Sequence, residues 1–466
     1  MHVNIFAKEV YIDRRKQLMT NMKSGLLLFM GNEESSVNFK DNWYPFRQDS
    51  TFLYYFGLDL PGLAAVIDLD NGNEIIFGNE LSIDDIIWTG PQPSVNELSN
   101  AVGVQQSGPV SQLTAMLQQA QQKGQTIHIL PPYRPENKIK LSSWLGISIQ
   151  GVDQFVSIPF IKSVIRQREI KGSIELEEMD KACDISGDMH MEVIRNTRPG
   201  VKEYELKGLA EAVALSNWGR TSYSTILSVD GQVLHNHYHG NTVKEGQMVL
   251  CDAGAETSRY YAGDLTRTVP AGKRFTTKQE ELYEVVLNSM NHAISLLRPG
   301  IEFREVHRQA AVKLMEGLAQ VGLVKGDPVE AVANDVHTLF FQCGLGHMIG
   351  LDVHDMEDLG EQYVGYTDEL KKKMVFGWKS LRLGKALQTG FTLTVEPGIY
   401  IIPELIDRWK AANKHESFVN YKLLEEYRHF GGIRIEDNFA ITENGYRKLG
   451  KHLPKSLDDL YTSRGE

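Results

Sequence analysis

The sequence predicts an α+β protein of two domains, a smaller α/β domain over residues 1–172 and a larger, strand-rich domain over residues 173–466. Two observations predict this division. A chain of 466 residues is too long for one ordinary domain, and its 42% hydrophobic and 23% charged residues are typical of a globular protein. The pattern also changes near residue 172, where a long charged segment with helical spacing begins.

The first domain alternates short apolar strands with helices. Asp70–Asn73 contains an Asn-Gly pair between two apolar runs, which is typical of a β-hairpin. The expected elements are strands at residues 26–30, 64–69, 74–77 and 126–130, and a helix over residues 112–122. This alternation predicts a small sheet with helices packed on it.

The second domain begins with a helix expected over residues 170–194, and a second helix is expected over residues 277–297. Each is followed by the same tripeptide, Arg198–Gly200 and Arg298–Gly300, which hints at two related halves. Short strands are expected at residues 248–251, 391–395 and 432–435. Lys371–Lys385 is basic and has no clear period, so it is interpreted as a surface insertion.

Charge and cysteine content limit the class of protein. With 49 basic and 60 acidic residues the net charge is −11, which argues against a nucleic-acid partner. The three cysteines, Cys183, Cys251 and Cys343, form no CxxC pair and predict no disulfide framework. Charged residues interrupt the N-terminus, and no apolar run has the length of a membrane span, so we expect a cytoplasmic protein without a membrane partner.

Two aspartates flank a polar turn in the second domain. Asp252 ends an apolar strand, Asp264 lies beyond the turn, and residue 258 is midway between them. A symmetric antiparallel hairpin would place the two carboxylates opposite each other. Because like charges in that position are destabilising, a divalent cation is the simplest compensation. The alternative is an ordinary exposed pair of aspartates on a hairpin surface.

A histidine and two glutamates extend this set. Glycines on both sides of His347 permit close backbone approach, and histidine is the commonest nitrogen ligand of metals. Glu396 and Glu436 each end an apolar strand, and buried carboxylates are rare unless they are paired or bound to metal. The alternatives are a packed, hydrogen-bonded histidine and ion pairing of Glu436 with Arg434 or Arg267.

The combined set is rich in oxygen donors. Its five residues are Asp252, Asp264, His347, Glu396 and Glu436. Four carboxylates balance the charge of two divalent ions, and such an ion pair can activate water and polarise a carbonyl. Oxygen ligands with one imidazole favour Mn²⁺, and Co²⁺ or Zn²⁺ are alternatives.

At these residues the sequence resembles a known family. CDAGAE, YAGDLTRTVP, GLGHMIGLDVHD, TVEPGIYI and GGIRIED resemble the successive signatures of the aminopeptidase P and prolidase branch of the pita-bread metallopeptidases. Residues 46–57 and 87–91 resemble the aminopeptidase P N-terminal, creatinase-like domain. The resemblance implies a pita-bread catalytic domain over residues 173–466, with a curved antiparallel sheet, helices behind it and metals in its concave face.

The resemblance also implies a role for each ligand. Asp252 would be a bidentate ligand of one metal, Asp264 and Glu436 would bridge both metals, and His347 and Glu396 would complete the other site. A hydroxide between the metals would attack the scissile carbonyl. Glu396 would act as ligand and general base together.

Further site residues follow from the same resemblance. His354 would hydrogen-bond the tetrahedral intermediate or the carbonyl on the proline side, and Arg434 would orient nearby carboxylates. A family histidine ahead of Asp252 is assigned to His235 by gap-free spacing, or to His237 if two residues are missing from the next loop. Tyr400 would line the site. Several relatives carry a histidine where this chain has Cys343, which leaves the substrate preference open.

The implied function is an Xaa-Pro aminopeptidase whose substrate is a peptide with proline at the second position. The alternatives are a prolidase, which accepts only Xaa-Pro dipeptides, and a non-catalytic pita-bread protein that binds peptides. The family also implies a homodimer or homotetramer in which the N-terminal domain of one subunit nears the site of another. Trp88 is either such a contact or a buried anchor within its own domain.

Overall fold

The computed structural model describes residues 5–465, which divide into two compact units. The first unit ends at Arg168 and also includes Met356–Tyr363, and the second comprises Glu169–Asp355 and the chain from Val364 onwards. The first unit thus ends close to the boundary expected at residue 172, but the return of Met356–Tyr363 to it was not expected. None of the helices within residues 5–465 is long and apolar enough to cross a membrane.

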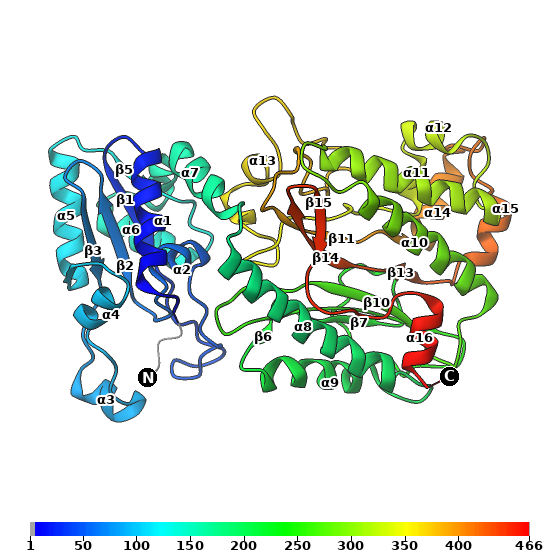
Figure 1. The fold of residues 1–466 in the computed structure, drawn as a ribbon, viewed down its shortest axis with the longest axis horizontal. Coiled ribbons are helices and arrows are strands. Elements are labelled where there is room, and N and C mark those ends of the chain that lie inside the picture. The colour runs from blue at the N-terminus through cyan, green and yellow to red at the C-terminus, as the bar shows by residue number, and fades with distance from the viewer. Residues whose placement is uncertain (1–4, 466) are drawn as a thin grey trace. The chain divides into compact units, whose positions relative to one another are not determined.

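The first unit is built on a mixed five-stranded sheet with the order β4-β3-β2-β1-β5 (Figure 1). Its strands are β1 (Leu26–Met30), β2 (Ala64–Asp68), β3 (Asn73–Phe77), β4 (Gln106–Gly108) and β5 (Ile127–Ile129). β2 and β3 are antiparallel, and Asp68 pairs with Asn73 across a turn in which Gly72 has a φ of 77°. The predicted hairpin is therefore confirmed.

Helices cover both faces of this sheet. They are α1 (Lys8–Asn21), α2 (Ser50–Phe56), α3 (Ile83–Thr89), α4 (Val95–Ala101), α5 (Val110–Gln122), α6 (Pro135–Leu145), η1 (Ile149–Phe155) and α7 (Ile158–Arg168). Leu26 and Leu28 face a core that includes Leu113 of α5. Phe29 faces the other way and its ring packs on Phe160 of α7 with centroids 5.2 Å apart. Strand alternation therefore divides the apolar residues between two helical layers.

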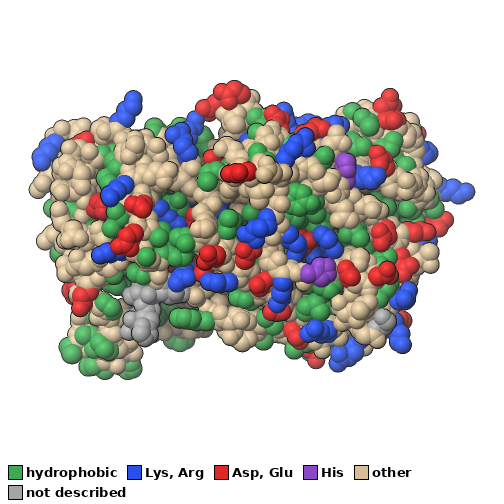
Figure 2. All heavy atoms as spheres, viewed as in Figure 1, with side chains coloured by type: hydrophobic (Ala, Val, Ile, Leu, Met, Phe, Trp, Pro, Cys, Tyr) green, Lys and Arg blue, Asp and Glu red, His purple; other side chains and the backbone are tan. Residues whose placement is uncertain are grey.

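Helix α3 differs from the other helices of this unit because none of its residues is buried. It begins with a capping box between Ser82 and Asp85, which satisfies its first backbone N–H groups. Ile83, Ile87 and Trp88 are 71%, 70% and 87% exposed. Trp88 is therefore no anchor within its own domain, and that alternative was wrong. Figure 2 shows hydrophobic side chains where Figure 1 places α3, at the lower left.

The second unit repeats one arrangement twice. Its long helices are α8 (Ser173–Asn196), α9 (Glu203–Ser216), α10 (Thr277–Ser295) and α11 (Phe303–Val321), and they pack as the pairs α8 with α9 and α10 with α11 (Figure 1). After α8, Gly200 N donates to Val243 O at 2.9 Å. After α10, Gly300 N donates to Leu387 O at 2.8 Å. Both glycines have positive φ, 92° and 86°, so the two tripeptides make equivalent turns.

Short strands lie between the helix pairs. They are β6 (Arg220–Thr221), β7 (Ile226–Ser228), β8 (Met248–Ala253), β9 (Ala255–Glu256), β10 (Leu265–Pro270), β11 (Thr392–Val395), β12 (Gly398–Tyr400), β13 (Gly432–Arg434), β14 (Asp437–Thr442) and β15 (Gly445–Lys448). The first half contributes the sheet β10-β8-β7, and the second contributes β11-β14-β15. Glu436 N donates to Thr266 O at 3.1 Å, which joins the two halves at their centre.

The remaining helical segments are short. They are α12 (Pro328–Ala333), η2 (Val336–Leu339), η3 (Glu357–Leu359), α13 (Glu361–Val364), α14 (Pro403–Ala411), α15 (Tyr421–Leu424), η4 (Glu425–Tyr427) and α16 (Leu457–Ser463). Acidic and basic side chains are interspersed on the face shown in Figure 2.

Two expectations about the second unit were wrong. Asp252 pairs with Thr266 rather than facing Asp264, because the turn is centred one residue later and Tyr260 takes a φ of 70° within it. The shift in pairing is two residues, so both carboxylates stay on the same face. Lys371–Lys385 is exposed at its start, but Trp378 and Lys385 are buried, so it is only partly a surface segment.

Candidate metal centre and active site

Asp252 and Asp264 lie at the centre of the second unit, on the hairpin formed by β8 and β10. They are 8% and 4% exposed, so the alternative of a surface pair was wrong. The Tyr223 hydroxyl hydrogen-bonds to both carboxylates, at 2.5 Å from Asp264 Oδ1. Arg434 Nη2 forms a buried ion pair with Asp252 Oδ2. The two carboxylates thus share one phenol hydroxyl and one guanidinium. These two partners therefore bring only one positive charge to two buried acidic groups.

His347 reaches the same space from a loop that lies against β11. A Cβ at Gly346 would overlap the Thr394 carbonyl, so glycine is required for this close approach. His347 Nδ1 lies 3.0 Å from Met348 O, while Nε2 lies 3.3 Å from Asp264 Oδ2. Because Nδ1 donates its hydrogen to the carbonyl, Nε2 is the nitrogen that can act as a ligand.

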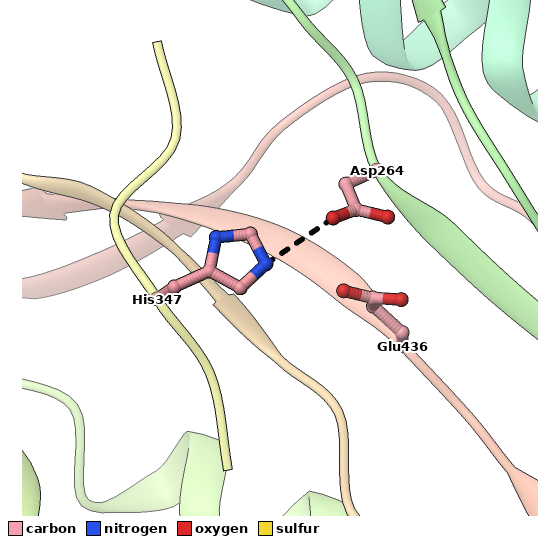
Figure 3. A group of neighbouring side chains, drawn as sticks. All are labelled: Asp264, His347 and Glu436. Atoms are coloured by element: carbon pink, nitrogen blue, oxygen red, sulfur yellow. Dashed lines mark ion pairs between the residues drawn. The ribbon is translucent and has the colours of Figure 1, made fainter. Parts of the chain in front are cut away.

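Glu436 follows β13 and faces Asp264 and His347 (Figure 3). Its Oε2 accepts a hydrogen bond of 2.7 Å from Thr266 Oγ1. Its Oε1 is buried and has no hydrogen-bond partner among the described residues. Arg434 pairs with Asp252 and Arg267 with Asp437, so the proposed neutralisation of Glu436 by either arginine was wrong.

Glu396 follows β11, and its carboxylate also lies beside His347. Its Oε1 is 3.5 Å from His347 Nε2 and accepts a hydrogen bond of 3.3 Å from Thr394 Oγ1. Burial raises the pKa of Glu396 to about 7, against the opposing positive charges of His347 and Arg434. A carboxyl group with such a pKa can take up and release a proton near neutral pH.

Charge crowding affects the other acidic groups. Burial and the negative charge of Asp264 raise the pKa of Glu436 well above its ordinary value, and burial raises that of Asp252 despite Arg434. Burial acts to raise the pKa of Asp264, but the hydrogen bonds from His347 and Tyr223 and the positive charge of His347 together lower it. Burial disfavours the His347 cation, yet Asp264 and Glu396 raise its pKa overall. The positive charges of Arg434 and His347 therefore do not balance the four carboxyl groups of the centre.

This arrangement fits a divalent cation. Asp264, His347 and Glu436 each offer one ligand atom, and these atoms lie within 4.8 Å of one another. Two oxygens and one imidazole nitrogen suit a borderline or hard divalent ion. The orphaned Glu436 Oε1 is explained if it serves as a ligand, since buried polar atoms are otherwise almost always satisfied.

A cavity of about 370 Å³ opens onto this cluster. The expected site residues that line it are Asp252, Asp264, His347, Glu396, Glu436, His235, His237, His354 and Arg434. The rings of His347 and His354 lie 4.3 Å apart. Partial burial and the Arg434 guanidinium lower the pKa of His235. Tyr400 is fully buried, and its hydroxyl accepts a hydrogen bond of 2.8 Å from Arg434 Nη1.

Sequence reasoning missed several residues of this site. Tyr223 contacts both aspartates, yet no local pattern distinguishes it from the other tyrosines of the chain. Arg382 and Ser380 line the cavity from the segment interpreted as a surface insertion. Thr266 and Thr394 donate to Glu436 and Glu396, and the alternation of threonine with apolar residues in β11 was the available signal for Thr394.

Comparisons with known families agree with this geometry. Residues 177–443 match the model of metallopeptidase family M24, and residues 11–129 match the aminopeptidase P N-terminal domain. The chain is 32% identical over 447 residues to human Xaa-Pro dipeptidase, covering 93% of this chain and 87% of the relative. It is 29% identical over 448 residues to a probable Xaa-Pro aminopeptidase of Aspergillus fumigatus, covering 94% and 92%.

Solved structures of similar proteins have the same architecture. A variant of Escherichia coli aminopeptidase P in complex with substrate superposes with a TM-score of 0.80 at 28% identity, covering 99% of both chains. Proline aminopeptidase P II from Yersinia pestis gives a TM-score of 0.81 at 27% identity, covering 99% of this chain and all of the other. The predicted two-domain α+β fold is therefore confirmed, and the chain belongs to metallopeptidase family M24, in its Xaa-Pro aminopeptidase and dipeptidase group.

Proposed function

We propose that this protein is an Xaa-Pro aminopeptidase that hydrolyses the bond between an N-terminal residue and a following proline. The observation that carries the proposal is the convergence of Asp264, His347 and Glu436 around a buried carboxylate oxygen without a partner. This cluster lies at the base of a cavity in a chain of the M24 family. A buried cluster with more carboxyl groups than cationic groups, open to a cavity, is suited to metal-assisted hydrolysis and has no evident structural role.

The proposed centre holds two divalent ions. Asp252, Asp264, His347, Glu396 and Glu436 would be the ligands, with Mn²⁺ favoured and Co²⁺ or Zn²⁺ as alternatives. A Zn-substituted form of E. coli aminopeptidase P is among the similar structures. When bound, such ions lower the pKa of water and polarise the scissile carbonyl.

The protein's own groups would hold the substrate and move its protons. Glu396, whose carboxylate lies beside His347 and lines the cavity, would accept a proton from the attacking water. His354 and His235 line the cavity and would donate hydrogen bonds to carbonyl oxygens of the substrate, with His237 as the alternative to His235. Arg434 would keep Asp252 in place through their buried ion pair.

A second candidate function is an Xaa-Pro dipeptidase. Arg382 lines the cavity, and a guanidinium there fits the free carboxylate of a proline at the end of a dipeptide. The human relative at 32% identity is named as a dipeptidase, so both names occur among similar proteins. The two activities would share the metal centre and differ at the far side of the proline.

One experiment tests both candidates. Metal-stripped protein is assayed before and after Mn²⁺ is returned, with an Xaa-Pro dipeptide, its C-terminal amide and an Xaa-Pro-Xaa tripeptide. Metal-dependent cleavage of the tripeptide supports the aminopeptidase. Cleavage of the free dipeptide alone supports the dipeptidase. No cleavage of any substrate by protein that binds metal would overturn both and favour a peptide-binding protein.

We also propose that the protein is cytoplasmic and assembles as a homodimer or homotetramer. The exposed Ile83, Ile87 and Trp88 of α3 support an assembly, because an isolated seven-residue helix without a buried face gains little from packing within its own unit.

A further inference from the structure

A fully buried ion pair lies beside the metal centre without reaching it. Lys171 Nζ is 2.7 Å from Asp355 Oδ2, and both side chains are only 1% exposed. Removing two charges from water is costly, and apolar replacements of such pairs are often as stable. We propose that Lys171 is a positioning residue that acts through Asp355 to orient the imidazoles of His347 and His354, an inference that rests on the proposed function.

The connection to His347 passes through one carbonyl group. Asp355 N donates to Met348 O at 3.0 Å, and His347 Nδ1 lies 3.0 Å from the same oxygen. The carbonyl that fixes the histidine ring is thus itself fixed by the backbone of Asp355. Lys171 holds the Asp355 side chain, so the lysine, the aspartate, the carbonyl and the imidazole form one continuous chain of polar contacts.

The connection to His354 is covalent, since His354 immediately precedes Asp355. Its ring packs on that of His347 with centroids 4.3 Å apart. A displacement of Asp355 would therefore move both histidine rings. The Lys171–Asp355 pair, which lies outside the proposed metal centre, thus fixes the loop that joins His347 and His354.

Close packing leaves the ion pair little freedom. A Cβ at Gly350 would lie 2.5 Å from Asp355 Oδ2 and 2.9 Å from Lys171 Cε. Lys171 N donates to Gly390 O at 2.9 Å, so the backbone that carries the lysine is also fixed. The Asp355 side chain therefore has few other conformations available while the charged Lys171 stays in place.

A neighbouring ion pair provides a matched control. Lys385 Nζ lies 2.5 Å from Glu169 Oε2, with side chains 9% and 10% exposed. Glu169 and Lys171 belong to the same short segment before α8, so both pairs hold that segment. The two side chains of this pair bond to each other and not to the loop that carries His347 and His354, so its loss tests the purely structural contribution.

The test compares Lys171→Met, Lys385→Met and the double variant Lys171→Met/Asp355→Asn. Binding of Co²⁺ to metal-stripped protein is measured by calorimetry and by the visible absorption of the bound ion, beside thermal stability and kcat. We expect Lys171→Met to weaken Co²⁺ binding about 10- to 100-fold and to change the absorption spectrum, as for other residues that support metal ligands. Lys385→Met should lose stability and keep both the affinity and the spectrum.

The double variant separates positioning from stability. It removes both charges of this pair, so we expect its thermal stability to exceed that of Lys171→Met while its Co²⁺ affinity and kcat remain low. Recovery of all three would overturn the proposal, as would equal effects of Lys171→Met and Lys385→Met on Co²⁺ binding. Wild-type protein that binds Co²⁺ but cleaves no Xaa-Pro substrate would overturn the proposed function alone, because the binding comparison remains valid.

Discussion

At the scale of single residues, the site is defined by one atom that the rest of the protein leaves unsatisfied. Tyr223 and Arg434 donate hydrogen bonds to Asp252, and Thr266 donates one to Oε2 of Glu436. The other oxygen, Oε1, is buried without a partner among the described residues. A buried acceptor without a donor costs stability, and a cation bound from solution would satisfy this oxygen.

Replacement of Glu436 by glutamine should separate stability from activity. The pKa of Glu436 is raised well above its ordinary value, so the metal-free protein favours the neutral form that glutamine imitates. We expect Glu436→Gln to raise the melting temperature of metal-free protein and to lower kcat by at least about 100-fold, since losing a ligand removes several kcal/mol of catalysis. Scanning calorimetry and peptide hydrolysis measure the two effects.

The control is Asp188→Asn, which removes a half-exposed carboxylate paired with Lys451 at the surface. It should change neither quantity appreciably, because surface ion pairs contribute little. A Glu436→Gln protein that melts lower than the wild type and retains its kcat would contradict the assignment of Glu436 as a metal ligand.

Arg382 should distinguish a free carboxylate from an amide. A charge-assisted hydrogen bond of about 1.5–3 kcal/mol corresponds to a roughly 10- to 100-fold change in rate. We expect Arg382→Gln to lower kcat/KM by this factor for an Xaa-Pro dipeptide and to spare its C-terminal amide. Lys379→Gln, an exposed cation nearby, is the control. Equal losses on both substrates would assign Arg382 a general role in shaping the cavity.

At the scale of elements, α11 and η2 contribute a second pair of histidines, which is buried and does not line the cavity. His307 and His337 are fully buried, their rings lie 6.2 Å apart, and none of their four nitrogens has a hydrogen-bond partner in the described chain. Both rings pack on Trp378, whose Nε1 donates to Asp335 at 2.7 Å. Two residues further along, Ser380 begins the wall of the cavity.

This pair should make the protein sensitive to acid. Burial lowers the pKa of His307 to about 3 and that of His337 to about 4, with the positive charge of Lys373 acting in the same direction. In the unfolded chain both titrate near 6.5. Between these values the unfolded state binds more protons at these two histidines, so their contribution to the free energy of unfolding should fall as the pH drops below about 6.5.

His307→Phe removes one of the two titrating groups and should reduce this pH dependence, whatever its effect on stability at neutral pH. Urea unfolding of metal-free protein between pH values of about 7 and 4.5 measures the dependence. His452→Phe is the control, because its side chain is 71% exposed. Identical dependence in the wild type and His307→Phe would show that the buried pair does not control acid stability.

At the scale of the whole molecule, the proposed metal centre depends on both halves of the second unit. The first half supplies Asp252 and Asp264 on its hairpin, and the second supplies Glu396 and Glu436 at the ends of β11 and β13. His347 enters from the long connection within the second half. The hydrogen bond from Glu436 N to Thr266 O closes the junction, so neither half alone has the donor set.

The surface of the first unit leads to a prediction about assembly. Ile87 and Trp88 are 70% and 87% exposed, which is typical of a protein–protein contact. We expect Ile87→Glu/Trp88→Glu to reduce the molar mass measured by light scattering to that of a smaller assembly. Val329→Glu, at a single apolar residue of α12 that is 51% exposed, should leave the mass unchanged. An unchanged mass in the α3 variant would exclude this helix as a contact.

The sequence alone determined the class of the fold and pointed to the proposed ligand set, because both depend on local pattern. Period-two apolar strands, the Asn-Gly hairpin and the repeated Arg-Pro-Gly turns are encoded in neighbouring residues. The spacing of Asp252, His347 and Glu436 within glycine-rich and apolar segments indicated the metal centre before any geometry was known. These signals need no information about residues that are distant in the chain.

Tertiary structure decided what local pattern could not. The hairpin register depends on the conformation of Tyr260 in the turn, and a shift of this kind is invisible in the hydrophobic pattern because it preserves the face. Tyr223, Arg382 and Lys171 reach the site or its supporting loop from segments without a distinctive motif. Their roles arise from contacts across long stretches of chain, which are fixed only when the core packs.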